Sequence, residues 1–150
     1  MPRIRKSIEI SAPLEDIFSF VADYRNARHF LQGFSEFQAI TKSQSGLGAK
    51  ARASGKFWGL PVNTILEITE FELNRRIVSK SVSGIKSSSV WIFEPGKKGT
   101  KVFFTAEYTV PGLMLGRLME NLVEKDVAEN NRQTLINLKR IMEKRAGTIS

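Results

Sequence analysis

The spacing of apolar residues starts with a strand period at residues 4–10 and then changes three times along the chain. Residues 11–23 repeat apolar side chains with a helical period, and the segment from residue 49 to residue 110 alternates apolar and polar residues as half-buried strands do. The helical period then returns and lasts to about Lys144. A chain built this way must pack strands against helices, which predicts an α+β fold.

Six segments have strand periodicity: 4–10, 49–57, 62–72, 75–83, 88–95 and 100–110. The last two are joined by the turn Gly96-Lys97-Lys98-Gly99. Two short helices are predicted after the first strand, the first with Pro13 at its start and the second from Asn26 to Leu31. The expected order is one strand, two short helices, about six antiparallel strands, five of which are located by their periodicity, and a long C-terminal helix gripped by a curved sheet.

The length of 150 residues suits one domain, residues 1–150. With no cysteine, disulfides and thiolate metal sites are excluded, and a single histidine speaks against a metal centre. We expect no cofactor. The opening MPRIRKSIEI lacks a signal-peptide core, and no apolar run approaches the roughly 18 residues of a membrane span. A cytoplasmic protein is therefore expected.

Three stretches resemble a known family. They are the opening IEISAPLEDIFSFVADYRNARHFL, the later VWIFEPGKKGTKVFFTAEYTVPG, and the terminal helix ending in LINLKRIMEKR. Together they are similar to the polyketide cyclase/dehydrase-like proteins of the START-related SRPBCC superfamily, from about Ile4 to Arg145. The resemblance implies a helix-grip fold of seven antiparallel strands around the long helix, with a hydrophobic cavity between them. Members of this superfamily bind lipids, polyketides or quinones, catalyse cyclisation, or act on ribosomes, and the fold does not choose among these.

A hydrophobic cavity is the leading functional hypothesis. Its walls are expected from the sheet residues Ala51, Ala53, Gly55, Phe57, Trp91, Phe93, Phe104, Ala106 and Tyr108, with Val127 on the opposing helix. Small side chains facing aromatic ones leave volume for an apolar ligand. The alternative is that the same residues form an ordinary packed core.

Few polar residues are candidates to orient a ligand. Glu124 and Asn131 lie seven residues apart on the terminal helix, so they share a face near Val127. If buried, Glu124 would have a raised pKa and could act as an acid or base; otherwise it is a solvated helix residue. Tyr108 could offer its hydroxyl at the rim or simply pack. A cyclase/dehydrase would use Glu124 and Tyr108, but we find no convergent catalytic set. His29 is interpreted as a surface residue, and Ser87 to Ser89 as a polar strand edge.

The net charge of +8 supports a second alternative. Its excess lies in two acid-free segments, residues 37–66 and 75–93, and not in a tail. The bases that alternate toward one side of these strands are Lys50, Arg52, Lys56, Arg76 and Lys80. On adjacent strands they would form a basic sheet face that contacts a ribosome, RNA or an anionic membrane, or that is merely solvated.

The terminal helix carries two apolar stripes, rotated from each other by roughly 130°. The first contains Leu115, Leu118, Met119 and Leu122, and the second contains Val123, Val127, Thr134, Leu135, Leu138, Ile141 and Met142. The second stripe is expected to face the sheet. The first could form a lid, a dimer contact or a membrane-touching patch, or pack on the sheet. The sequence leaves the oligomeric state open.

Overall fold

The computed structural model of the chain describes residues 3–43, 45–57, 60–84, 86–109 and 117–147. Its elements are β1 (Arg3–Ile10), α1 (Leu14–Ala22), the 3-10 turn η1 (Tyr24–Asn26), α2 (Ala27–Phe30), β2 (Glu36–Ala39), β3 (Lys50–Phe57), β4 (Leu60–Glu72), β5 (Arg76–Gly84), β6 (Lys86–Pro95), β7 (Thr100–Thr109) and α3 (Arg117–Gly147). This is the predicted order, with β2 added. Residues 36–39 were not predicted as a strand.

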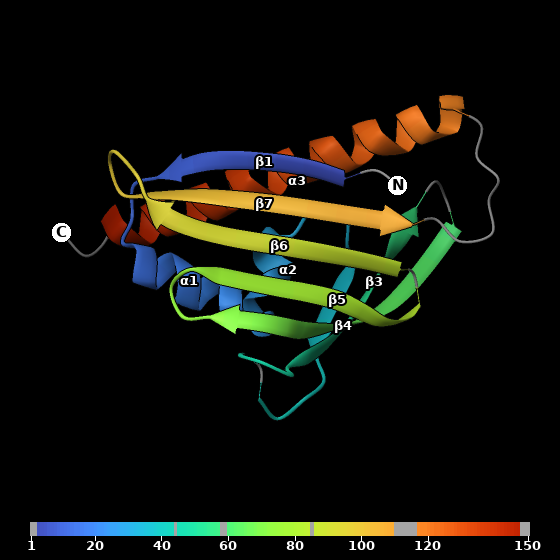
Figure 1. The fold of residues 1–150 in the computed structure, drawn as a ribbon, viewed down its shortest axis with the longest axis horizontal. Coiled ribbons are helices and arrows are strands. Elements are labelled where there is room, and N and C mark those ends of the chain that lie inside the picture. Colours follow the sequence, from blue (N-terminus) through green and yellow to red (C-terminus); the bar gives the residue numbers. More distant parts are fainter. Residues whose placement is uncertain (1–2, 44, 58–59, 85, 110–116, 148–150) are drawn as a thin grey trace.

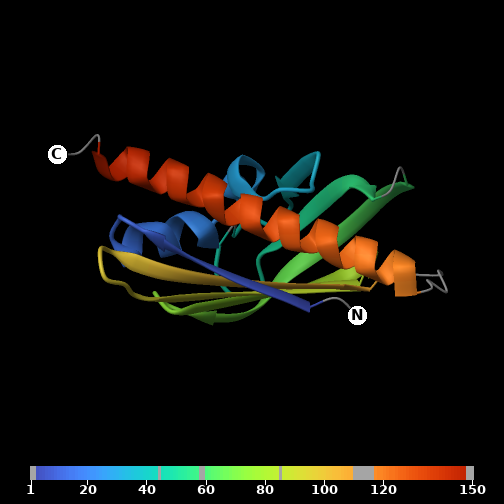
Figure 2. The ribbon, with the colours of Figure 1, turned by 90° about the horizontal axis from the view of Figure 1, so that it is seen from above.

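The seven strands form one antiparallel sheet in the order β1-β7-β6-β5-β4-β3-β2. Figure 1 looks onto its outer face, with α3 behind the sheet. Seen from above, β3 and β4 curl back toward the helix side, while α3 runs the length of the opposite wall (Figure 2). The result is a half-barrel that grips α3, and the predicted helix-grip α+β fold is confirmed.

The aromatic part of the core lies beneath α1 and α2. Phe18 of α1 packs edge-on against Phe93 at a centroid distance of 5.2 Å, and Phe30 of α2 packs against Trp91 at 5.8 Å. Trp91 in turn stacks on Phe104, with centroids 4.2 Å apart. Such ring pairs contribute about 0.5–1.5 kcal/mol each beyond area burial. This end of the half-barrel is therefore filled.

Helix α3 buries the second apolar stripe, as predicted. Its buried members are Val127, Thr134, Leu135, Leu138 and Met142. Ile141 is half-buried against the same core. In the first stripe, Leu122 is half-buried, and Leu115 and the side chains of Leu118 and Met119 lie outside the described residues. The side chain of Val123, in the second stripe, lies outside them as well. The α3 side chains thus continue the core across the inner face of the sheet.

Side chains of α3 also bind the edge of β1. The Asn131 amide donates to the Ile4 carbonyl oxygen at 3.1 Å, and the Lys139 ammonium donates to the Glu9 carbonyl oxygen at 2.8 Å. Glu143 accepts from the Ser11 amide at 2.8 Å and pairs with Lys139 at 2.7 Å. The unpaired backbone groups of an edge strand can pair with strands of other molecules. The contacts from α3 give some of the β1 backbone groups a partner within the chain.

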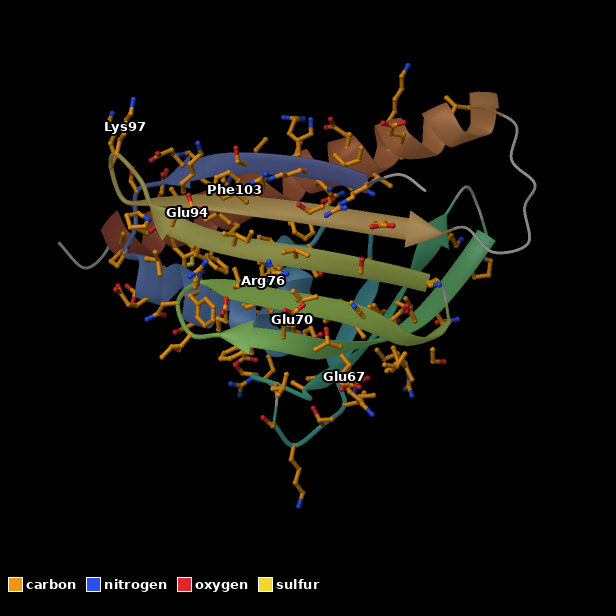
Figure 3. The ribbon with its side chains drawn as sticks, viewed as in Figure 1. Glu67, Glu70, Arg76, Glu94, Lys97 and Phe103 are labelled. Carbon is orange, nitrogen blue, oxygen red and sulfur yellow. The ribbon has the colours of Figure 1, made fainter. Side chains whose placement is uncertain are left out.

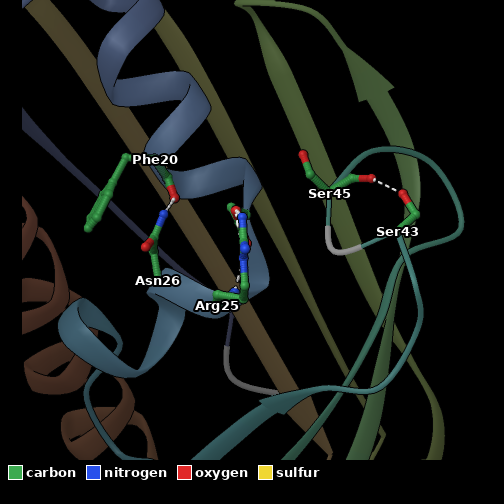
Figure 4. Close-up of polar contacts among 6 residues, drawn as sticks. Phe20, Arg25, Asn26, Ser43 and Ser45 are labelled. Carbon is green, nitrogen blue, oxygen red and sulfur yellow. Dashed lines mark hydrogen bonds and ion pairs between the residues drawn. The ribbon is translucent and has the colours of Figure 1, made fainter.

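The chain turns sharply between α1 and α2, and side chains hold the turn. The Asn26 amide donates to the Phe20 carbonyl oxygen at 3.0 Å, and Arg25 pairs with Asp23 at 2.6 Å (Figure 4). Hydrogen bonds from Arg25 hold the pKa of the Asp23 carboxyl below its ordinary value. A separate loop bond, from the Ser43 hydroxyl to the Ser45 carbonyl oxygen, lies in the β2–β3 connection in the same view. The turn between α1 and α2 places Tyr24 against the inner face of the sheet.

Candidate functional site

The inner face of β6 changes character along the strand. Phe93 and Trp91 are buried, whereas Ser89 and Ser87, which have the same parity, are half-buried. Across the sheet, Ser89 pairs with Ala106 of β7 and with Ser79 of β5. The inner face therefore passes from packed rings to small and hydroxyl-bearing side chains toward the start of β6.

Four serines define the centre of this region, which we call the serine strip: Ser79, Ser81, Ser87 and Ser89. Ser79 and Ser89 are opposite each other on β5 and β6. The Ser87 amide donates to the Ser81 hydroxyl oxygen at 2.9 Å. Leu66 of β4 is opposite Ser81 and is also half-buried. These residues form the floor of the half-barrel, between the wall that carries α3 and the curled β3–β4 wall.

Tyr24 reaches the strip from η1. Its hydroxyl lies 2.6 Å from the Ser79 hydroxyl oxygen, and both residues are buried. Burial raises the pKa of Tyr24 to about 12, because the phenolate would lose its hydration there. The phenol is thus a neutral hydrogen-bonding group near neutral pH and not a base.

Three of the β3 residues predicted as cavity wall, Ala51, Ala53 and Gly55, are covered. Ala51 and Ala53 have no exposed surface, and β2 pairs along both of them. A Cβ atom at Gly55 would lie 2.7 Å from the Gly33 carbonyl oxygen. The expectation that Gly55 leaves free volume is wrong, because the glycine admits a neighbouring backbone. A ligand contact of Ala51 or Ala53 stays a prediction.

The aromatic candidates divide in two. Trp91, Phe93 and Phe104 all point to the inner face and are buried in the ring cluster described above. The ring cluster borders the serine strip where Ala106 follows Phe104 on the inner side of β7, and a ligand contact of these rings stays a prediction. The side chains of Phe57 and Tyr108 lie outside the described residues.

The helix candidates are not brought together. Val127 and Asn131 are buried, and Asn131 donates to the β1 backbone. Glu124 is exposed and lines an open groove of about 700 Å³ between β1 and α3, with Leu122, Lys125 and Ala128. The burial that an acid–base role for Glu124 requires is absent, because this side of the helix overhangs the sheet edge.

The basic sheet face is interrupted by acids. Arg76 lies 3.7 Å from Glu70 and Lys50 lies 3.9 Å from Glu67. Figure 3 shows Glu67, Glu70 and Arg76 together on the outer face. Arg52, Lys56 and Lys80 are exposed on that face. The acids lie in β4, within the acidic stretch 67–74 between the two basic segments in sequence, and they pair with Lys50 of β3 and Arg76 of β5 across the strands.

Catalytic groups are scarce at the site. Among the described residues, the inner faces of the strands carry no carboxylate and no imidazole, and Lys6 is their one charged side chain. No cluster of three potential metal ligands occurs in the described part of the chain. None of the described helices is long and apolar enough to cross a membrane. The arrangement can hold a molecule by apolar contact and hydroxyl hydrogen bonds.

Comparison with known families agrees with this geometry. The family model described as "Polyketide cyclase / dehydrase and lipid transport" matches residues 1–143. The chain belongs to this family. The resemblance indicated by the sequence is thereby confirmed. No protein with a curated description matches the chain.

Solved structures share the fold of this polyketide cyclase/dehydrase family member over nearly their whole length. TTHA0849 from Thermus thermophilus is 25% identical, with a TM-score of 0.78 over 93% of this chain and 95% of its own. DR_A0006 from Deinococcus radiodurans is 18% identical, with a TM-score of 0.71 over 95% and 98%. Ara h 8.0201 is 11% identical, with a TM-score of 0.66 over 93% and 96%.

Proposed function

We propose that the protein binds a hydrophobic small molecule between the inner face of the sheet and α3. One observation supports this most strongly: the half-buried floor of the half-barrel around Ser89, next to a core that is otherwise buried. The family description, which names polyketide chemistry and lipid transport, supports the same class of ligand. Burial of apolar ligand surface would drive binding, at about 25 cal/mol per Å².

Binding without catalysis is the favoured form of this proposal. A cyclase or dehydrase needs an acid or base beside the substrate. The exposed position of Glu124 and the raised pKa of Tyr24 leave neither residue as a base on the inner face. The strip supplies hydroxyls, which orient a molecule and do not abstract protons at neutral pH.

The test places a larger side chain on the floor of the half-barrel. Ser89→Leu adds apolar volume at the proposed ligand position, and Ser88→Leu adds it on the outer face, where Ser88 pairs with Lys80 and Glu107. Binding of the neutral fluorescent probe N-phenyl-1-naphthylamine is measured by titration. We expect Ser89→Leu to lose at least about tenfold in affinity and Ser88→Leu to match the wild type. Equal affinity for all three proteins would overturn the proposal.

Stability provides a second measurement on the same variants. Overpacking a filled core costs typically about 1–3 kcal/mol, whereas a leucine that enters free space costs little. We expect Ser89→Leu to unfold within about 1 kcal/mol of the wild type. The salt dependence of binding distinguishes the proposed function from binding of a polyanion at the basic sheet face. The affinity for an apolar ligand hardly changes between about 0.05 and 0.5 M salt, whereas the affinity for a polyanion falls steeply.

A further inference from the structure

The hydroxyls of the serine strip differ in whether they have a hydrogen-bond partner. Ser79 is paired with Tyr24, and the Ser81 oxygen accepts the Ser87 amide. Within the described part of the chain, the side-chain hydroxyls of Ser87 and Ser89 have no hydrogen-bond partner. Both side chains are nevertheless on the inner parity of β6, in line with buried Trp91. Two free hydroxyls therefore face the space assigned to the ligand.

An apolar molecule without polar atoms would be a poor occupant of this floor. Covering a hydroxyl without giving it a hydrogen bond carries an uncompensated desolvation cost. A hydrocarbon chain lying on Ser87 and Ser89 would incur that cost twice. A carbonyl or hydroxyl oxygen at the same place would replace the water that solvates each serine. The floor thus favours an oxygenated ligand over a pure hydrocarbon.

The adjoining surface favours a partly apolar ligand. Ala106 and Trp91 flank Ser89 on the inner face, and Leu66 lies opposite Ser81. Within the described residues, Lys6 on the edge strand β1 is the one charge on the inner strand faces. Strand β7 separates Lys6 from the serine strip, so a carboxylate buried on the strip would lack a paired cation, and neutral oxygens suit these surroundings better.

We propose that the ligand is a neutral ring or chain that carries carbonyl or hydroxyl oxygens, and that Ser87 and Ser89 donate hydrogen bonds to those oxygens. This rests on the proposed function and specifies its ligand class. Ser87 and Ser89 act as specificity determinants. The packed rings of Trp91 and Phe104 bound the apolar part of the same molecule.

The test uses two probes of the same ring size, naphthalene and 1,4-naphthoquinone. The protein has no cysteine, so the quinone meets no thiol. Binding of each is measured by competition with N-phenyl-1-naphthylamine, in the wild type, in the double variant Ser87→Ala/Ser89→Ala, and in Ser88→Ala. Ser88 is half-buried like its neighbours but lies on the outer face, so it is the matched control.

We expect the double variant to bind naphthoquinone at least about fivefold more weakly, with naphthalene affinity unchanged or higher. Ser88→Ala should bind both probes as the wild type does. If naphthoquinone binds the double variant as tightly as the wild type, the assignment of the serines is wrong while the proposed function stands. If neither probe displaces the fluorophore from any form, the proposed function fails and the serine assignment fails with it.

Discussion

Tyr24 is a titratable residue that the fold takes out of water. Its phenol is buried and bonded to Ser79, so its pKa is raised to about 12. The folded value exceeds the ordinary value of 10.0, which means that this stabilisation is complete below pH 10 and is lost as the pH rises toward 12. The two tyrosines of the chain, Tyr24 and Tyr108, can be separated by substitution.

Ultraviolet titration at alkaline pH tests this environment. We expect one of the two phenols to ionise near pH 12 in the wild type, and this transition to be missing in Tyr24→Phe. The Tyr24→Phe variant should lose about 1 kcal/mol of unfolding free energy, because Ser79 loses its partner. Ser79→Ala is the control, and the double variant should cost less than the sum. Ionisation of both phenols near pH 10 would contradict the buried hydrogen bond.

Glu143 links pH to the attachment of α3. Hydrogen bonds from Lys139 and the Ser11 amide lower the pKa of its carboxyl from the ordinary 4.5. A lowered folded pKa means that the stabilisation is present above about pH 4.5 and is lost as the pH falls through the folded value. The contact should therefore weaken only in acid.

Comparison with Glu143→Gln measures that contribution. At pH 7 we expect the variant to be less stable by about 1 kcal/mol, because a charge-assisted pair is lost. The difference should shrink as the pH falls below the ordinary value of 4.5. Urea unfolding at several pH values measures it, with Glu124→Gln, an exposed glutamate of the same helix, as the control. A difference that persists unchanged in acid would contradict the assignment.

Among the elements, β5 depends on a glycine at its end. Gly84 has φ of +83°, and an added Cβ would collide with the Asn63 carbonyl oxygen of β4. Gly46 has φ of +86°, but nothing lies within 4 Å of its Cβ position. Both glycines thus have a left-handed backbone that an alanine would strain, and Gly84 also has a neighbouring backbone that an alanine would meet.

Alanine at each position separates these effects. We expect Gly46→Ala to lose about 1 kcal/mol of unfolding free energy, from left-handed strain alone. Gly84→Ala should lose clearly more, about 2–4 kcal/mol, because β4 and β5 must separate. Thermal and urea unfolding of both variants give the comparison. Equal losses would show that β4 does not approach Gly84 closely.

The elements also show what periodicity could predict. The strands of eight or more residues and the α3 stripe carry apolar patterns that persist over many residues, so their existence was predicted within a few residues. β2 is four residues long and contains one buried residue, Phe37, which is too short a pattern to register. Phe37 is held there by tertiary contact with Tyr24, at a ring distance of 5.6 Å.

The site was harder to predict than the fold. Small residues on β3 were interpreted as free volume, but Gly55 is covered by the backbone of Gly33, which lies distant in sequence. Ser87 and Ser89 were interpreted as a polar edge, although they share the parity of Trp91 and Phe93. That parity was the available signal. It was obscured because apolar residues occupy both faces of the strand from Val90 to Phe93.

At the scale of the whole molecule, packing is asymmetric. Rings fill the half-barrel beneath α1 and α2, and α3 is tied to β1 by hydrogen bonds along one wall. The β5–β6 floor carries short side chains at the other end. The proposed ligand binding uses this asymmetry: the packed rings would keep the core intact while the shorter side chains of the floor contact the ligand.

Native mass spectrometry of the protein purified from its own host tests the central claim most directly. We expect a bound small molecule that is released on denaturation and contains carbonyl or hydroxyl oxygens. We also expect that Ser89→Leu, produced in the same host, carries little or none of it, whereas Ser88→Leu carries as much as the wild type. A wild-type mass equal to that of the bare chain, with no small molecule in the extract, would contradict the account.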